Sequence, residues 1–197
     1  MRLRALLWSS CISAAMAVSA FAATSAATRE CPAGKVSAES YTHDFKGEAN
    51  AVFKDVQNDA QEALYHADQL EGFAQNGNIS WESQAVQLDQ VKGDINDIGA
   101  KLCRLETIRR VVAPWQQGAI DQIAMDARLM ADNAQDAILF GGTHQHELWL
   151  ATYRHNLDNL YNEAKGLTRS ADHAVKYASV SKEYRGLRHD LEPQGSE

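Results

Sequence analysis

Residues 146–178, HELWLATYRHNLDNLYNEAKGLTRSADHAVKYA, carry apolar side chains in alternating steps of three and four positions. Such steps average 3.5 residues, which is the period of a seam between packed α-helices. The seam consists of Leu150, Tyr153, Leu157, Leu160, Ala164, Leu167, Ala171, Ala174 and Ala178. As a helix, this stretch would be roughly 50 Å long. An apolar stripe of that length needs partner helices of similar length, so the fold depends on whether the rest of the chain supplies them.

The rest of the chain repeats this pattern three times, over residues 40–74, 81–112 and 115–139. The fourth helix is expected over 144–178. Prolines occur only at positions 32, 114 and 193, and no stretch shows the alternation typical of a strand. Short connections between long helices force neighbours to be antiparallel. We therefore predict an all-α, up-down-up-down four-helix bundle that occupies residues 40–180 as a single domain.

Capping residues predict the helix ends. Gly72 and the sequence Asn76-Gly77-Asn78 are expected to end the first helix, and Ser80 to cap the second. Gly141-Gly142 is expected to stop the third helix, with Thr143 as the cap of the fourth. Pro114 favours a turn between the second and third helices. The alternative is a kink within one helix over 81–140.

The two ends of the chain differ from the bundle. Residues 1–22 have a basic start, an apolar stretch and the sequence Ala20-Phe21-Ala22, which together predict a cleaved signal peptide. The alternative is a retained anchor over residues 5–23, a length that nearly spans a membrane. Residues 23–39 are expected to form an extended arm. Residues 181–197 are expected to form a tail, helical at first and then disordered, because the seam is lost there.

Export and charge limit the classes of partner. The chain has a formal net charge of −7, and removing residues 1–22, which contain two arginines and no acid, makes it −9. An acidic surface is a poor general binder of nucleic acid. The mature chain has no further stretch suited to span a membrane. We therefore expect a periplasmic or extracellular protein without a nucleic-acid partner.

Two cysteines, Cys31 and Cys103, remain after cleavage of the predicted signal peptide. In an oxidising compartment an even count with one pairing predicts a disulfide between them. The bond would tie the arm to the second helix. The alternative is a buried thiol at Cys103, beside Leu102 and Leu105, with Cys31 unpaired.

The best metal-ligating residues in the sequence are His144, His146 and Glu147. Imidazole and carboxylate groups suit zinc, copper or nickel. Two histidines separated by two positions do not share a helix face, however, so a loop would have to present them. The alternative is that these three residues are solvated side chains in a first helical turn, and we predict no resident metal or cofactor.

Motifs of common enzymes do not occur: the sequence has no G-x-S-x-G, no glycine-rich phosphate loop and no H-E-x-x-H.

Trp149 flanks the seam and is expected to contact a partner if it is exposed. Cations gather near the ends of the second and fourth helices, at Arg109, Arg110, Lys176, Lys182, Arg185 and Arg188. These cations either stabilise the helices, because the C-terminal end of a helix dipole is negative, or bind an anionic partner.

These observations favour an exported, non-enzymatic helical bundle that acts as a binding or structural module of the cell envelope. The alternative is a small metal- or cofactor-binding bundle with its site at the His144/His146 end. A third expectation is a homo-oligomer, because the seams are rich in alanine and such faces can pack against a second copy.

Overall fold

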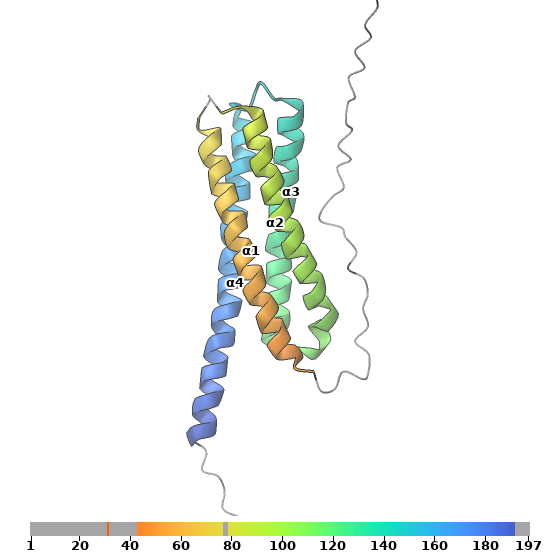
Figure 1. Cartoon of the computed structure of the whole chain (residues 1–197), viewed down its shortest axis with the longest axis vertical. Coiled ribbons are helices and arrows are strands. Elements are labelled where there is room, and N and C mark those ends of the chain that lie inside the picture. The colour runs from red at the N-terminus through yellow and green to blue at the C-terminus, as the bar shows by residue number, and fades with distance from the viewer. Residues whose placement is uncertain (1–30, 32–42, 77–78, 192–197) are drawn as a thin grey trace, which may run out of the picture.

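The computed structural model describes residues 31, 43–76 and 79–191, which form four long helices (Figure 1). The helices are α1 (Phe45–Ala74), α2 (Trp81–Ile108), α3 (Pro114–Thr143) and α4 (Ala151–Leu191), with a short 3-10 turn, η3 (Arg109–Val111), after α2. Each helix is antiparallel to the next, and α1 also packs along α4, which closes the bundle. The described residues contain no strand. The predicted all-α four-helix bundle is confirmed.

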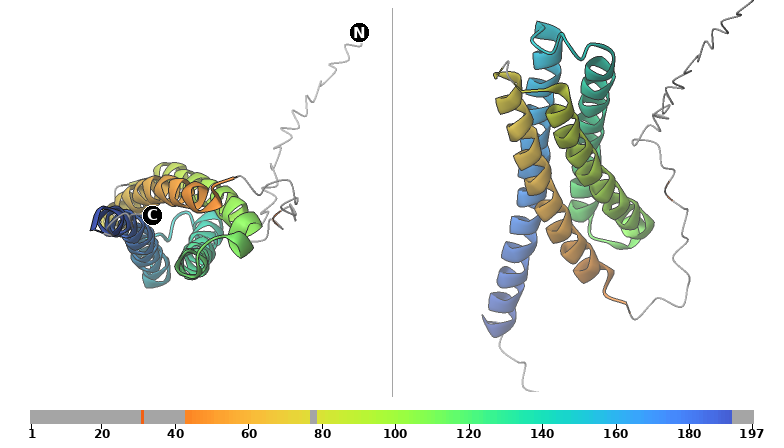
Figure 2. Two further views of the ribbon diagram at one scale, coloured as in Figure 1. Left: turned by 90° about the horizontal axis from the view of Figure 1, so that it is seen from below. Right: turned by 45° about the horizontal axis from the view of Figure 1, so that its top comes forward.

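The core consists of the predicted seams. On α4 the buried residues are Tyr153, Leu157, Leu160, Ala164, Leu167, Ala171 and Ala174. On α1 they are Ala49, Phe53, Val56, Ala60, Ala63, Ala67 and Leu70. Because many of these side chains are small, α1 and α4 approach closely, and the Thr168 hydroxyl donates a 2.9 Å hydrogen bond to the Ala60 carbonyl oxygen across the interface. The end-on view in Figure 2 shows α1 and α2 on one side of the bundle and α4 and α3 on the other.

The turn between α2 and α3 follows the prediction at Pro114. Ala113 has an extended backbone, and Pro114 is the first residue of α3. The buried Gln116 side chain fixes this corner, because its Oε1 accepts from the Ala113 amide at 2.9 Å while its Nε2 donates to Asn50 and to the Lys46 carbonyl. A turn, not a kink, therefore separates these helices.

The predicted boundary between the third and fourth helices is wrong. α3 continues through Gly141 and Gly142 to Thr143, and α4 begins at Ala151 instead of 144. The Thr143 hydroxyl donates back to the Leu139 and Phe140 carbonyls, at 2.9 and 3.1 Å, so it does not cap α4. Residues 144–150 form a loop with successive turns.

Other ends differ less from prediction. α1 begins at Phe45, where the Asp44 carboxylate accepts from the Gly47 amide at 2.9 Å, instead of at residue 40. α2 ends at Ile108, four residues early, because the chain tightens into η3. α4 continues to Leu191, so the helix extends past residue 180. The predicted signal peptide, the arm apart from Cys31, and residues 192–197 lie outside the described residues.

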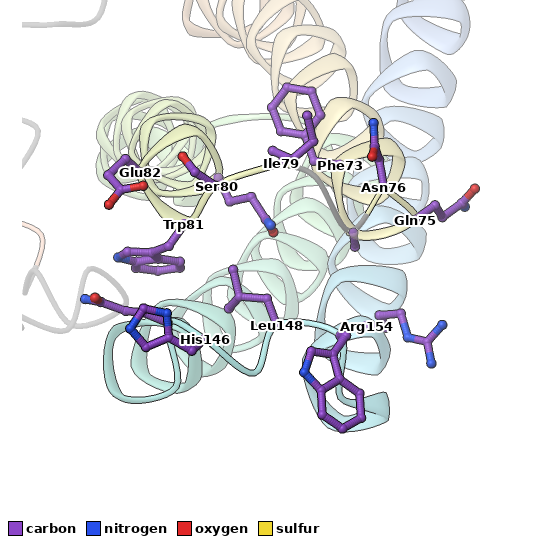
Figure 3. A pocket seen from close by; sticks show the side chains of 14 residues that line it. Phe73, Gln75, Asn76, Ile79, Ser80, Trp81, Glu82, His146, Leu148 and Arg154 are labelled. Atoms are coloured by element: carbon purple, nitrogen blue, oxygen red, sulfur yellow. The ribbon is translucent and has the colours of Figure 1, made fainter.

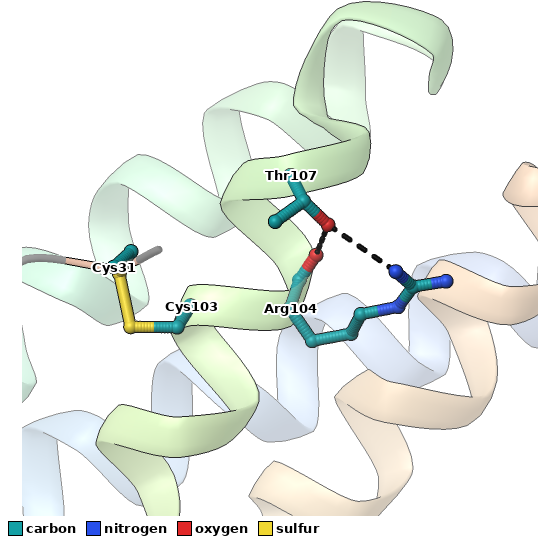
Figure 4. The surroundings of a disulfide bond; sticks show 4 residues. All are labelled: Cys31, Cys103, Arg104 and Thr107. Carbon is teal, nitrogen blue, oxygen red and sulfur yellow. Dashed lines mark hydrogen bonds between the residues drawn. A yellow bond between two sulfur atoms is a disulfide. The ribbon is translucent and has the colours of Figure 1, made fainter. Parts of the chain in front are cut away.

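Cys31 lies against the last turns of α2, beside Cys103 (Figure 4). Its Cα atom is 5.1 Å from that of Cys103, within the usual range for a disulfide, and Figure 4 shows the two sulfur atoms joined. The pair borders a cavity of about 240 Å³ between α2 and α3, which contact each other less than the other adjacent helices do. The geometry therefore suits the predicted cysteine pairing.

Candidate functional site

The end of the bundle that holds the α1–α2 turn and the α3–α4 loop contains a cavity of about 500 Å³, which we call the turn-end pocket (Figure 3). Trp81 and His146 lie on one side of it and Arg154 on the other, with Leu148 between them. Trp149 also lines the pocket. Its volume falls in the range of small-molecule sites, and aromatic walls with a few polar groups are typical of such sites.

Trp81 is held in place from two directions. It begins α2 directly after Ser80, whose hydroxyl accepts a hydrogen bond from the Ser83 amide at 3.4 Å and caps the helix as predicted. Its indole ring packs against the backbone of the buried Gly141 on α3, where a Cβ atom would overlap ring atoms Cζ3 and Cη2. The missing side chain at position 141 therefore makes room for the pocket wall.

Gln84 brings an unsatisfied polar atom to the pocket. It is three residues after Trp81 and therefore on the same face of α2. Its side chain is only 2% exposed, yet its Oε1 accepts no hydrogen bond within the described part of the chain. A buried acceptor left without a donor costs about 1–3 kcal/mol. Because Gln84 lines the turn-end pocket, this unpaired acceptor lies at its edge, although the oxygen itself has almost no exposed surface.

Charged groups line the pocket as well. The Glu82 carboxylate is exposed, and its pKa is lowered first by a hydrogen bond with Ser80, then by its own backbone amide and by the charge of His146. The exposed guanidinium of Arg154 comes from the start of α4. The pocket therefore holds both signs of charge around an aromatic interior.

The metal-ligating residues singled out in the sequence are separated by their contacts. The His144 ring stacks on Phe140, with centroids 4.4 Å apart, and its Nδ1 lies 2.7 Å from the Thr143 hydroxyl. His146 lines the turn-end pocket, whereas Glu147 is an exposed loop residue outside its lining. Among the described residues, no three histidine, cysteine or acidic side chains gather closely enough to hold a metal ion.

A stack of rings supports the loop beside the pocket. Phe140 lies between His144 and Tyr153, and the Phe140 and Tyr153 centroids are 5.9 Å apart. Tyr153 is completely buried, its hydroxyl makes no hydrogen bond to any residue that the structure describes, and burial raises its pKa. The stack fixes the end of α3 against the start of α4.

Part of this site is predictable from the sequence. The sequence offers His146 as a ligand and Trp149 as an exposed contact, and Trp149 is 67% exposed and lines the pocket. Gln84 and Arg154 were missed. A glutamine one turn after a helix cap carries no sequence signal, because only the position of the α3–α4 loop makes it part of a cavity.

The cations singled out in the sequence lie in different places. Arg109 donates to both carboxylate oxygens of Asp121, at 2.8 and 2.6 Å, which fastens η3 to α3 and raises the Arg109 pKa. Lys182, Arg185 and Arg188 lie instead on the last turns of α4.

Comparison of the chain with protein-family models, with curated proteins and with solved structures found no match. Within the described residues, none of the helices combines the length and the apolar character needed to cross a membrane.

Proposed function

We propose that this chain is an exported, non-enzymatic binding module of the cell envelope and that the turn-end pocket receives its ligand. Export is supported by the signal-peptide pattern of residues 1–22 and by the cysteine pair. The non-enzymatic part rests on the sequence, which contains none of the common catalytic motifs.

The observation that carries the binding role is the unsatisfied Oε1 of Gln84 beside the aromatic wall formed by Trp81. Such a site suits a flat, largely apolar group that donates one hydrogen bond. Because Trp81 and Gln84 are both fixed on α2, the pocket is pre-formed, and little ordering is needed on binding.

The test is an NMR titration of the mature protein with phenol and with anisole, which share a ring but differ in the O–H donor. Phenol should shift the indole N–H signals of Trp81 and Trp149, whereas the signal of Trp115, at the opposite end of the bundle, should stay unchanged. Phenol should bind roughly tenfold more tightly than anisole, because only phenol satisfies the buried acceptor.

The matched variant is Gln84→Leu, which keeps the size of the side chain but removes its acceptor. It should bind both probes equally. Equal binding of phenol and anisole to the wild type, or no shift at Trp81 and Trp149 with either probe, would contradict the proposed site.

A further inference from the structure

The last turns of α4 project beyond the rest of the bundle (Figures 1 and 2). α4 has 41 residues, whereas α1, α2 and α3 have 28–30. From Tyr177 to its end, α4 carries large apolar side chains that are 53–81% exposed: Tyr177, Val180, Tyr184, Leu187 and Leu191. We call these five residues the α4 stripe.

The α4 stripe has the spacing of a helix–helix seam. Its residues are separated by steps of 3, 4, 3 and 4, which is the a/d pattern of a coiled coil. It is not a continuation of the bundle's own seam, which would pass from Ala174 through Ser181, Arg185 and Arg188. The stripe therefore lies on another face of α4. Its first residue, Tyr177, packs on Trp115 of α3, whereas the residues that follow are more than half exposed.

From this pattern we infer that the α4 stripe pairs with the same stripe of a second copy of the chain, forming a short parallel coiled coil. With Tyr177, Tyr184 and Leu191 at a positions, Val180 and Leu187 occupy d positions. The polar residues Lys182 and Arg185 then fall at positions f and b, which face away from the seam. A self-complementary stripe is what a symmetric dimer requires.

Charge at the edges of the stripe selects the parallel arrangement. Glu183 falls at a g position and Arg188 at the e position of the next heptad, and these two positions face each other across a parallel pair. Each Glu183 would thus meet Arg188 of the partner subunit, twice per dimer. In an antiparallel pair g positions face g positions, so Glu183 would meet Glu183 of the partner subunit or Asp190 of the partner subunit, which is repulsive.

The dimer is favoured by the bundle even though the stripe is short. An isolated helix of this length would be marginal in water, but the projecting segment continues a helix whose earlier turns are locked in the core. The first residue of the stripe is also braced, because the Tyr177 ring packs on Trp115 with centroids 4.7 Å apart. A membrane surface is a poorer occupant, since the segment carries Glu183 and Asp190 among its cations.

The test is sedimentation equilibrium of the mature chain over a wide range of protein concentrations. The wild type should approach twice the monomer mass, and Leu187→Glu should remain a monomer. Leu139→Glu is the matched control, because Leu139 is similarly exposed (53% against 56%) but lies on α3 away from the stripe, and it should dimerise like the wild type. Far-ultraviolet circular dichroism would verify that each variant keeps its helices.

Charge exchange tests the parallel geometry. Glu183→Arg and Arg188→Glu should each weaken the dimer, and the double variant should recover it. A wild type that stays monomeric, a dimer unaffected by Leu187→Glu, or association only with anionic lipid vesicles would overturn the inference. So would a stronger dimer in Glu183→Arg, which is the result expected of an antiparallel pair in which residue 183 meets Asp190 of the partner subunit.

Discussion

The six-membered ring of Trp81 lies against the backbone of Gly141, and these two residues join the start of α2 to the end of α3. A Cβ atom at position 141 would overlap the ring, whereas one at Gly142 would meet nothing within 4 Å. The two adjacent glycines therefore have different roles: the first makes room for the pocket wall, and the second does not.

Gly141→Ala should lower the free energy of unfolding by about 1–3 kcal/mol, because the added methyl group displaces a packed indole ring. Gly142→Ala is the matched control and should be neutral or stabilising by up to about 1 kcal/mol, since alanine is the better helix former. Urea unfolding followed by circular dichroism measures both. Equal effects of the two substitutions would show that Trp81 does not pack on Gly141.

Tyr153→Phe should leave stability at neutral pH unchanged or raise it, because the buried hydroxyl has no partner among the described residues. Burial raises the Tyr153 pKa above its usual 10.0, so the unfolded chain ionises first as the solution becomes alkaline. The wild type should then lose stability as pH rises above 10, and Tyr153→Phe should lose less.

Thermal unfolding at pH 7 and above pH 10 checks this prediction. Tyr161→Phe, a partly buried tyrosine of the same helix, is the control for loss of a hydroxyl. A clear loss of stability in Tyr153→Phe at pH 7 would show that the hydroxyl has a hydrogen-bond partner in solution.

Glu48 links α1 to α2 through an ion pair with Arg104 and also lies 2.7 Å from the His43 ring nitrogen. Burial tends to raise the Glu48 pKa, but the hydrogen bonds and charges of Arg104 and His43 outweigh it and lower the pKa below 4.5. Glu48→Gln should therefore reduce stability at pH 7, by less than about 1 kcal/mol because Arg104 is half exposed.

The sign of the pH effect follows from the lowered pKa. The contribution of Glu48 is complete above pH 4.5 and is lost as pH falls through the folded-state pKa. Urea unfolding at pH 7 and at pH 3 should therefore show a larger difference between wild type and Glu48→Gln at the higher pH. A difference in unfolding free energy of equal size at both pH values would mean that the charge of the Glu48 carboxylate does not contribute to stability.

The Cys31–Cys103 pair encloses a long loop, with a sequence separation of 72 residues. In the chain-entropy model a bond across such a loop stabilises the fold by about 4 kcal/mol. Oxidised protein should show no reactive thiol after denaturation, and Cys31→Ser with Cys103→Ser should unfold at lower urea concentration. Two reactive thiols in denatured wild type isolated without reductant would exclude the bond.

The interior of the fold was predictable because it depends on local periodicity. Every α4 residue from Tyr153 to Ala174 that the 3.5-residue seam selected is buried, and Pro114 marks a turn as its fixed backbone requires. The α3–α4 boundary failed because two adjacent glycines usually end a helix. Here both glycines stay helical, and glycine is needed at position 141 because Trp81, sixty positions earlier in the chain, occupies the space that a Cβ atom would fill.

The candidate site was less predictable than the core, because it depends on contacts between residues that are far apart in the sequence. Gln84 lines a cavity together with residues of the 144–150 loop, and this arrangement has no counterpart in nearby sequence. The α4 stripe does not follow from the bundle seam, because the apolar positions after Ala174 continue in another register.

The most direct test of the proposed binding role is a crystal structure of the mature protein soaked with phenol. It should show the ring in the turn-end pocket beside Trp81, with the phenol oxygen within hydrogen-bond distance of Gln84 Oε1. A pocket filled by protein side chains, with Gln84 Oε1 already accepting a hydrogen bond from the chain itself, would contradict the proposal.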